Sequence, residues 1–231
     1  MPDRYRIPNS VFIGCPWRTV RPKYERCAKQ LEKRFPLAVI LIDSAETPDA
    51  QQLFTLIKER LAESSLALFD VTGGNANVSL EFGLAEGYGV SRRLLLSTHR
   101  SSRRAGDTPI IADLAGATRL NYTSEPGLLR HLTQLFEQHP YTIRFERFLS
   151  NRYRHRSGPQ KKRLRTLAVK TIHLARRQAD GRPPLRREVV ERLGGDAAGY
   201  SEAEINAVLA DLHTSGLVRV GPGRYSRIEI T

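Results

Sequence analysis

The sequence has little of what a disulfide scaffold, a zinc domain or a membrane protein needs. It has two cysteines, Cys15 and Cys27, no C-x-x-C pair and six scattered histidines, so it predicts neither a disulfide framework nor a bound metal. No apolar run is long enough to span a bilayer and no signal-peptide pattern is present, which predicts a cytoplasmic protein with no membrane partner. The Rossmann G-x-G-x-x-G and the P-loop Gly-Lys-Ser/Thr are also missing.

What is present indicates a folded α/β chain. At 231 residues, with 40% hydrophobic and 26% charged residues, the chain has room for one α/β domain and a smaller second one. Short apolar runs alternate with helical patterns, which predicts a doubly wound, mostly parallel sheet of about five strands. The predicted strands are Ser10–Gly14, Leu37–Ile42, Leu66–Phe69, Arg93–Ser97 and Thr118–Tyr122, and the helices between and after them are Pro22–Phe35, Ala50–Ser64, one from Val78, and Ser124–Gln138.

The stretch from Ser65 to Gly89 carries the strongest functional signal. Its buried strand stops at Asp70, and a polar turn with two glycines follows, which permits positive φ and a close backbone approach to a ligand. Asn77 is the predicted N-cap of the next helix, which places Glu81 just inside the first turn, at the edge of the sheet where ligands bind. The residues of the turn predicted to contact a substrate are Gly73, Gly74, Asn75 and Asn77.

Two carboxylates of this stretch are candidate catalytic residues. On spacing alone, Glu81 is a candidate catalytic carboxylate, because it lies at the ligand-facing end of the helix. An acid near a helix start is also favoured by the helix dipole alone. Asp70 can orient a group of the ligand or the glutamate, or it can simply accept a hydrogen bond from the backbone of the turn.

The loop after the first predicted strand should lie beside this turn. That strand is normally central in a doubly wound sheet, so its loop reaches the point where nucleotides bind. Trp17 either stacks on a base or packs on the edge of the domain. A long connection, His99–Gly116, carries Arg100, Arg103 and Arg104, which are lower-ranked candidates for phosphate contacts. The loop residues predicted to contact the substrate are Gly14, Cys15, Pro16 and Trp17.

A resemblance to known families rests on these residues. Asp70, Asn75, Asn77, Val78, Glu81, Gly83 and Ala85 form the pattern D-x4-N-x-N-V-x2-E-x-G-x-A, which resembles the signature of nucleoside 2-deoxyribosyltransferase-like and TIR-like families. The string VFIGCPW is similar to the opening strand and loop of TIR-like domains. The resemblance implies a flavodoxin/TIR-like sheet and a glutamate, here Glu81, that acts on the anomeric carbon while an N-glycosidic bond breaks. NAD or a nucleotide would be the substrate, not a cofactor.

The C-terminal part holds most of the net charge of +13. Residues 141–231 contain 19 Lys+Arg against 9 Asp+Glu, which suggests a polyanionic partner. We predict three regions: an α/β domain over residues 1–140, a basic linker over 141–160 and a small domain over 161–231. In the last region, predicted helices Leu164–Ala179, Leu185–Leu193 and Ser201–Ser215 precede a hairpin of Leu217–Val220 and Tyr225–Ile230, which resembles a winged helix-turn-helix. The last of these helices opens with a predicted capping box formed by Ser201 and Glu204.

Nucleic-acid binding by this region is expected to depend on the phosphate backbone. The predicted recognition helix, Ser201–Ser215, is acidic, and its charges would repel phosphates in a groove. Docking of a protein is the alternative function of such a module. The residues predicted to contact nucleic acid are Arg154, Lys161, Lys162, Arg163, Arg165, Arg186, Arg187 and Arg224.

The domain order as a whole resembles the effector subunits of one class of bacterial retron anti-phage systems. That resemblance implies an N-glycosidase effector whose C-terminal module engages a reverse transcriptase and its nucleic acid, DNA or an RNA–DNA hybrid, and we expect a homo-oligomer. The alternative from another class is a non-enzymatic, nucleotide-sensing transcription regulator with a winged helix.

Overall fold

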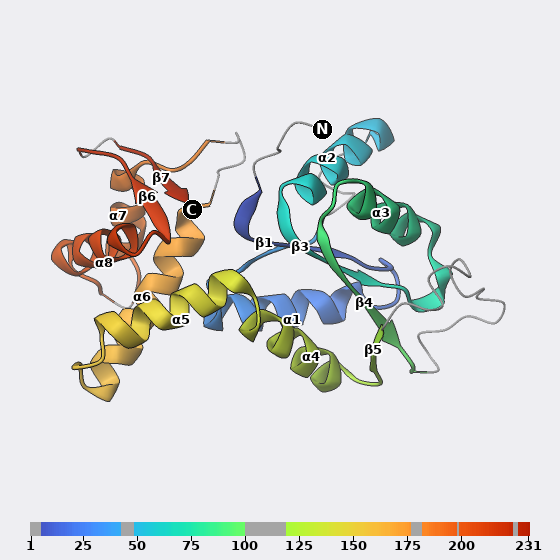
Figure 1. The fold of residues 1–231 in the computed structure, drawn as a ribbon, viewed down its shortest axis with the longest axis horizontal. Helices are drawn as coiled ribbons and strands as arrows, with labels where there is room; N and C mark the ends of the chain where they lie inside the picture. Colours follow the sequence, from blue (N-terminus) through green and yellow to red (C-terminus); the bar gives the residue numbers. More distant parts are fainter. Residues whose placement is uncertain (1–5, 43–48, 100–118, 177–181, 198, 224–225) are drawn as a thin grey trace. The chain divides into compact units, whose positions relative to one another are not determined.

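The computed structural model describes residues 6–42, 49–99, 119–176, 182–197, 199–223 and 226–231 (Figure 1). The chain divides into two units. The first comprises Met1–Leu31 and Ala38–Leu135, and the second comprises Glu32–Leu37 and Phe136–Thr231. Within the described ranges, no helix has the length and apolar character required to cross a lipid bilayer.

The first unit is built on a parallel sheet of five strands, as predicted. Its strand order is β2-β1-β3-β4-β5, which is flavodoxin-like. The second strand lies on one side of the first, and the third lies on the other, so the winding direction reverses between β1 and β3. The strands are β1 (Ile7–Gly14), β2 (Ala38–Ile40), β3 (Ser64–Asp70), β4 (Ser91–Ser97) and β5 (Arg119–Tyr122).

Helices cover both faces of this sheet. One face carries α2 (Ala50–Ala62) and α3 (Ala76–Gly87), and the other carries α1 (Arg21–Arg34) and α4 (Glu125–Glu137) (Figure 1). The neighbouring strands β1 and β3 are buried along most of their length, as expected for strands inside a parallel sheet with helices on both faces. The core below α2 and α3 contains Phe12, Leu61, Phe69, Val78, Ala85 and Leu94.

The second unit contains four helices and a two-stranded antiparallel hairpin among its described residues. The last three helices precede the hairpin in the predicted order. The predicted capping box of the last helix is confirmed, because the Ser201 hydroxyl accepts from the Glu204 amide and the Glu204 carboxylate accepts from the Ser201 amide. The elements are α5 (Pro140–Arg152), α6 (Gly158–Leu174), α7 (Arg186–Gly194), α8 (Glu202–Thr214), β6 (Val218–Val220) and β7 (Ile228–Ile230).

The segment 141–160 differs from the predicted basic linker, because it forms most of α5 and the beginning of α6. The spacing of Tyr141, Phe145, Phe148 and Leu149 gives α5 an apolar stripe, and all four side chains are buried. The hydroxyl of Tyr141 also donates to the carbonyl of Leu217 in the same unit, at 2.8 Å. The C-terminal part of the second unit therefore begins at Phe136. The basic residues of segment 141–160 lie on the exposed side of packed helices.

Candidate functional site

The carboxyl ends of β1 and β3 carry the predicted site. Gly14 ends β1, Asp70 ends β3, and Gly14 pairs with Phe69 in the parallel register. After Asp70 the chain makes a single 3-10 turn in which Gly73 and Gly74 have φ of +74° and +60°. The turn therefore requires its glycines, as the sequence predicted.

Asn75, and not Asn77, caps helix α3. The side-chain oxygen of Asn75 accepts from the amides of Asn77 and Val78, at 3.0 and 3.2 Å. Gly74 turns the chain so that Asn75 has the extended backbone of an N-cap, and Asn77 lies exposed in the first turn. The helix therefore begins earlier than predicted, and Glu81 lies in the second turn, where the helix dipole gives an acid little stabilisation.

Glu81 directs its carboxylate at the end of β1. Its Oε2 atom is buried and has no hydrogen-bond partner among the described residues. A Cβ atom added to Gly14 would lie only 2.2 Å from this oxygen, so the carboxylate occupies the space that the missing side chain leaves. Burial raises the pKa of Glu81 to about 7.

Aromatic rings make the surroundings of Glu81 apolar. Phe69 of β3 is fully buried, and its ring edge would lie 2.8 Å from a Cβ atom on Gly14. It packs edge-on against Phe82 of α3, with ring centroids 5.5 Å apart, and against Phe12 of β1 at 6.2 Å. Phe69 therefore lies close to the carboxylate, and the burial of Glu81 is the physical cause of its raised pKa.

Asp70 lies in a different environment, because both of its carboxylate oxygens are occupied. Tyr24 of α1 and Tyr122 of β5 donate to Oδ2 at 2.9 and 2.5 Å, and the amide of Thr72 donates to Oδ1 at 2.9 Å. The side chain is fully buried. Burial raises its pKa, and these hydrogen bonds oppose that effect. Asp70 thus holds the turn, which is the structural alternative considered for it, and its two tyrosine partners were not predicted.

The loop that follows β1 is buried at Cys15 and Pro16 and exposed at Trp17. Cys15 is buried, and burial together with the neighbouring Asp70 raises its thiol pKa, so the thiol stays protonated. The carbonyl of Pro16 accepts from the amides of Val20 and Arg21, both at 3.3 Å. Trp17 has 41% of its surface exposed, and the guanidinium of Arg21 lies 4.1 Å from its ring centroid. Stacking of Trp17 on a base stays a prediction.

Most of the arginines predicted to bind nucleic acid are held by groups of the second unit. Arg163 pairs with Glu204, Arg165 with Glu146, and Arg187 with Glu191. Arg186 donates to the side-chain oxygen of Asn206, at 2.6 Å. Lys161 and Lys162 are exposed, and Arg154 is exposed and donates to His155. Arg224 and the lower-ranked Arg100, Arg103 and Arg104 lie outside the described residues.

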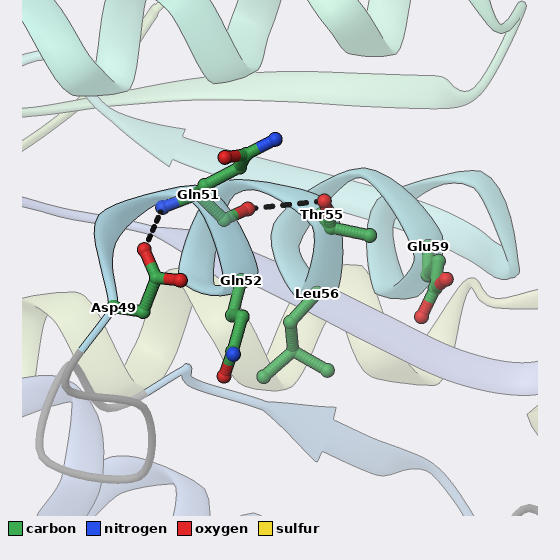
Figure 2. A pocket seen from close by; sticks show the side chains of 6 residues that line it. All are labelled: Asp49, Gln51, Gln52, Thr55, Leu56 and Glu59. Carbon is green, nitrogen blue, oxygen red and sulfur yellow. Dashed lines mark hydrogen bonds between the residues drawn. The ribbon is translucent and has the colours of Figure 1, made fainter.

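A hollow of about 330 Å³ lies elsewhere, along the outer side of α2 (Figure 2). Helix α2 and its cap supply every side chain drawn there: Asp49 accepts from the amide of Gln51, and Thr55 donates to the carbonyl of Gln51 (Figure 2). It contains none of the predicted site residues. No group of three or more His, Cys, Asp or Glu side chains in the described part of the chain is placed to hold a metal ion.

Comparison with known proteins gives a distant likeness to solved structures. No protein-family model matches the sequence, and no curated protein matches it. Among solved structures, the chain is similar to a CMP N-glycosidase of Clostridium botulinum, BcmB, with 17% identity and a TM-score of 0.36. The match covers 55% of this chain and 98% of that one. At this TM-score the likeness supports no conclusion about the function of this chain.

Proposed function

We propose that the first unit is an N-glycosidase that breaks the bond between base and ribose in NAD or another nucleotide, with Glu81 as the catalytic carboxylate. One observation carries the proposal. A carboxylate with a buried, unpartnered oxygen among the described residues lies over Gly14, where the strand order of a parallel sheet reverses. Sheets of this topology bind their ligands at that point.

A structural role explains Glu81 poorly. A buried polar atom without a hydrogen bond costs free energy, and structural acids in protein interiors are normally paired. Asp70, at the end of β3, accepts three hydrogen bonds. Oε2 of Glu81 accepts none from the described residues. We therefore assign the two carboxylates different roles: Asp70 positions the turn, and Glu81 reacts.

The reaction uses the negative charge of Glu81. As the C1′–N bond breaks, its electron pair leaves on the base, and positive charge develops on the sugar ring. The carboxylate stabilises this charge while water adds to C1′ and loses a proton, or it bonds to C1′ and is released when water hydrolyses the ester. Because Oε2 of Glu81 is buried, the attraction between the two charges is stronger than in bulk solvent.

The glycine turn and the Trp17 loop supply the remaining contacts. The backbone at Gly73 and Gly74 has no side chains that would block a ligand, and Trp17 offers an exposed ring for the base. The side-chain oxygen of Asn75 already caps α3, so its contact with a substrate would come from its amide nitrogen or its backbone. A role in anti-phage defence belongs to the same proposal and rests on the sequence resemblance alone.

The experiment that tests the activity is a search for free base. The full chain is incubated with NAD and with ribo- and deoxyribonucleoside monophosphates, and the products are separated by liquid chromatography. We expect release of nicotinamide or a nucleobase together with the matching sugar product. Nucleotide binding without base release would contradict the proposal and would favour the nucleotide-sensing regulator.

A further inference from the structure

The second unit carries a basic surface that the predicted hairpin and recognition helix do not include. We name it the α5–α6 corner and define it by Arg154, Arg156, Lys161 and Lys162. All four side chains are exposed and lie within nine consecutive residues, between the end of α5 and the second turn of α6. The sequence has no acidic residue between Glu146 and Asp180, so no neighbour along the chain offsets these charges.

Seven basic residues of the second unit pair with carboxylates, whereas the four residues of the corner form no ion pair with any described residue. Among the described residues of the unit, each paired carboxylate contacts an arginine or a lysine outside the corner. The Nε of Arg154 donates to Nε2 of His155 at 2.8 Å, and this contact supplies no negative charge to offset that of the guanidinium. The pairs outside the corner are Arg34–Glu137, Arg152–Asp211, Arg163–Glu204, Arg165–Glu146, Lys170–Asp196, Arg176–Glu32 and Arg187–Glu191.

We infer that the α5–α6 corner binds the phosphate backbone of a nucleic acid. Four uncompensated cations on a short segment give the dense positive charge that a polyanion recognises. This function goes beyond the proposed glycosidase activity, and it does not depend on that activity.

The same surface offers little to a protein or a membrane. The aromatic side chains of the region, Phe145, Phe148 and Tyr153, are buried, with at most 7% of their surface exposed. Protein interfaces use exposed aromatic anchors, and membrane-surface segments insert apolar side chains. Because stacking on bases also needs an exposed ring, the corner contacts phosphates and does not read sequence.

The test uses the full chain and a fluorescently labelled DNA duplex of about one to two helical turns, with binding followed by anisotropy at several salt concentrations. The variant Lys161→Gln/Lys162→Gln removes two charges of the corner. The matched control Lys29→Gln/Lys33→Gln removes the same charge from exposed positions of another helix, α1. Arg163 is left intact because it pairs with Glu204 and lies over the ring of Tyr200.

We expect the corner variant to reduce the magnitude of the negative slope of log K against log salt by about 1.8, the value for two phosphate contacts on duplex DNA. At 0.1 M salt its affinity should fall about tenfold or more, and a scrambled duplex should bind equally well. The control should match the wild-type protein. Arg154→Gln/Arg156→Gln is a second variant with the same expected effect, should the first not fold.

Three results would overturn the inference. The corner variants and the control can lose affinity equally, which would mean that only net charge matters. The wild-type protein can fail to bind the duplex at low salt. It can also bind vesicles containing phosphatidylserine while ignoring the duplex, which would assign the corner to a membrane surface.

Discussion

Replacing Gly14 by alanine perturbs the candidate site at its tightest point. The added Cβ atom would lie 2.2 Å from Glu81 Oε2 and 2.8 Å from Cδ1 of Phe69, so at least one neighbour must move. Phe69 is fully buried between two other aromatic rings, whereas the carboxylate is the end of a flexible side chain. The carboxylate is therefore displaced first. Gly14 ends a β-strand, and alanine fits an extended backbone.

The displacement predicts a loss of activity that exceeds the loss of stability. Moving a catalytic group by about 1 Å costs about 10²-fold in rate, whereas overpacking relieved by a mobile side chain costs about 1 kcal/mol, the low end for such changes. The rate of base release and the free energy of unfolding in urea measure the two effects separately.

Gly87→Ala is the matched control, because it adds the same methyl group on the helix that carries Glu81. A Cβ atom there meets nothing within 4 Å. We expect wild-type activity and a stability that is unchanged or raised by up to about 1 kcal/mol, since alanine favours helix over glycine. A folded Gly14→Ala variant with the wild-type rate would refute the placement of the carboxylate, and so would an equal loss of activity in Gly87→Ala.

Further predictions follow from the pKa of Glu81 and from two polar contacts. Base release should rise with pH and level off above about 7, because burial raises the pKa of Glu81 to about 7 and the ionised form is the active one; a pH–rate profile measures this. Because the pKa of Glu81 is raised in the folded state, the free energy of unfolding of the wild-type protein falls as the pH rises from about 4.5 to 7. Glu81→Gln should therefore be more stable than wild type by about 1–3 kcal/mol at pH 8, and by less at pH 5. Urea denaturation at both pH values measures this difference. Tyr122→Phe removes a donor to the buried Asp70 and should cost about 1–3 kcal/mol in urea denaturation. Arg163→Gln breaks an exposed pair with Glu204, which solvent screens, and should leave the stability nearly unchanged, measured in the same way.

The sequence predicted the features that depend on neighbouring residues. Apolar runs identified the five strands, and the pair Gly73–Gly74 identified the turn with positive φ, because both signals are local. The capping box at Ser201 was predicted for the same reason. The prediction of Asn77 as the N-cap was wrong, because Asn75 caps the helix. Asparagine is a good cap at either position, and only the backbone after Gly74 decides between them.

Features that join distant segments were not predicted. Tyr24, Asp70 and Tyr122 meet in the folded chain although they come from a helix and two strands far apart in the sequence. Ion pairs such as Arg163–Glu204 likewise cannot be found from charge counts, so the predicted nucleic-acid residues included arginines that are already paired. The apolar spacing of α5 was visible in the sequence, but its many charges led to the prediction of a linker.

The most direct test of the central proposal is the rate of base release by Glu81→Gln, measured beside the wild-type protein at pH 8. The change keeps the size of the side chain and removes the charge that faces C1′. We predict a rate at least about 10²-fold lower in a variant with the wild-type circular dichroism spectrum. A folded Glu81→Gln variant that releases base at the wild-type rate would contradict the assignment of Glu81 as the catalytic carboxylate.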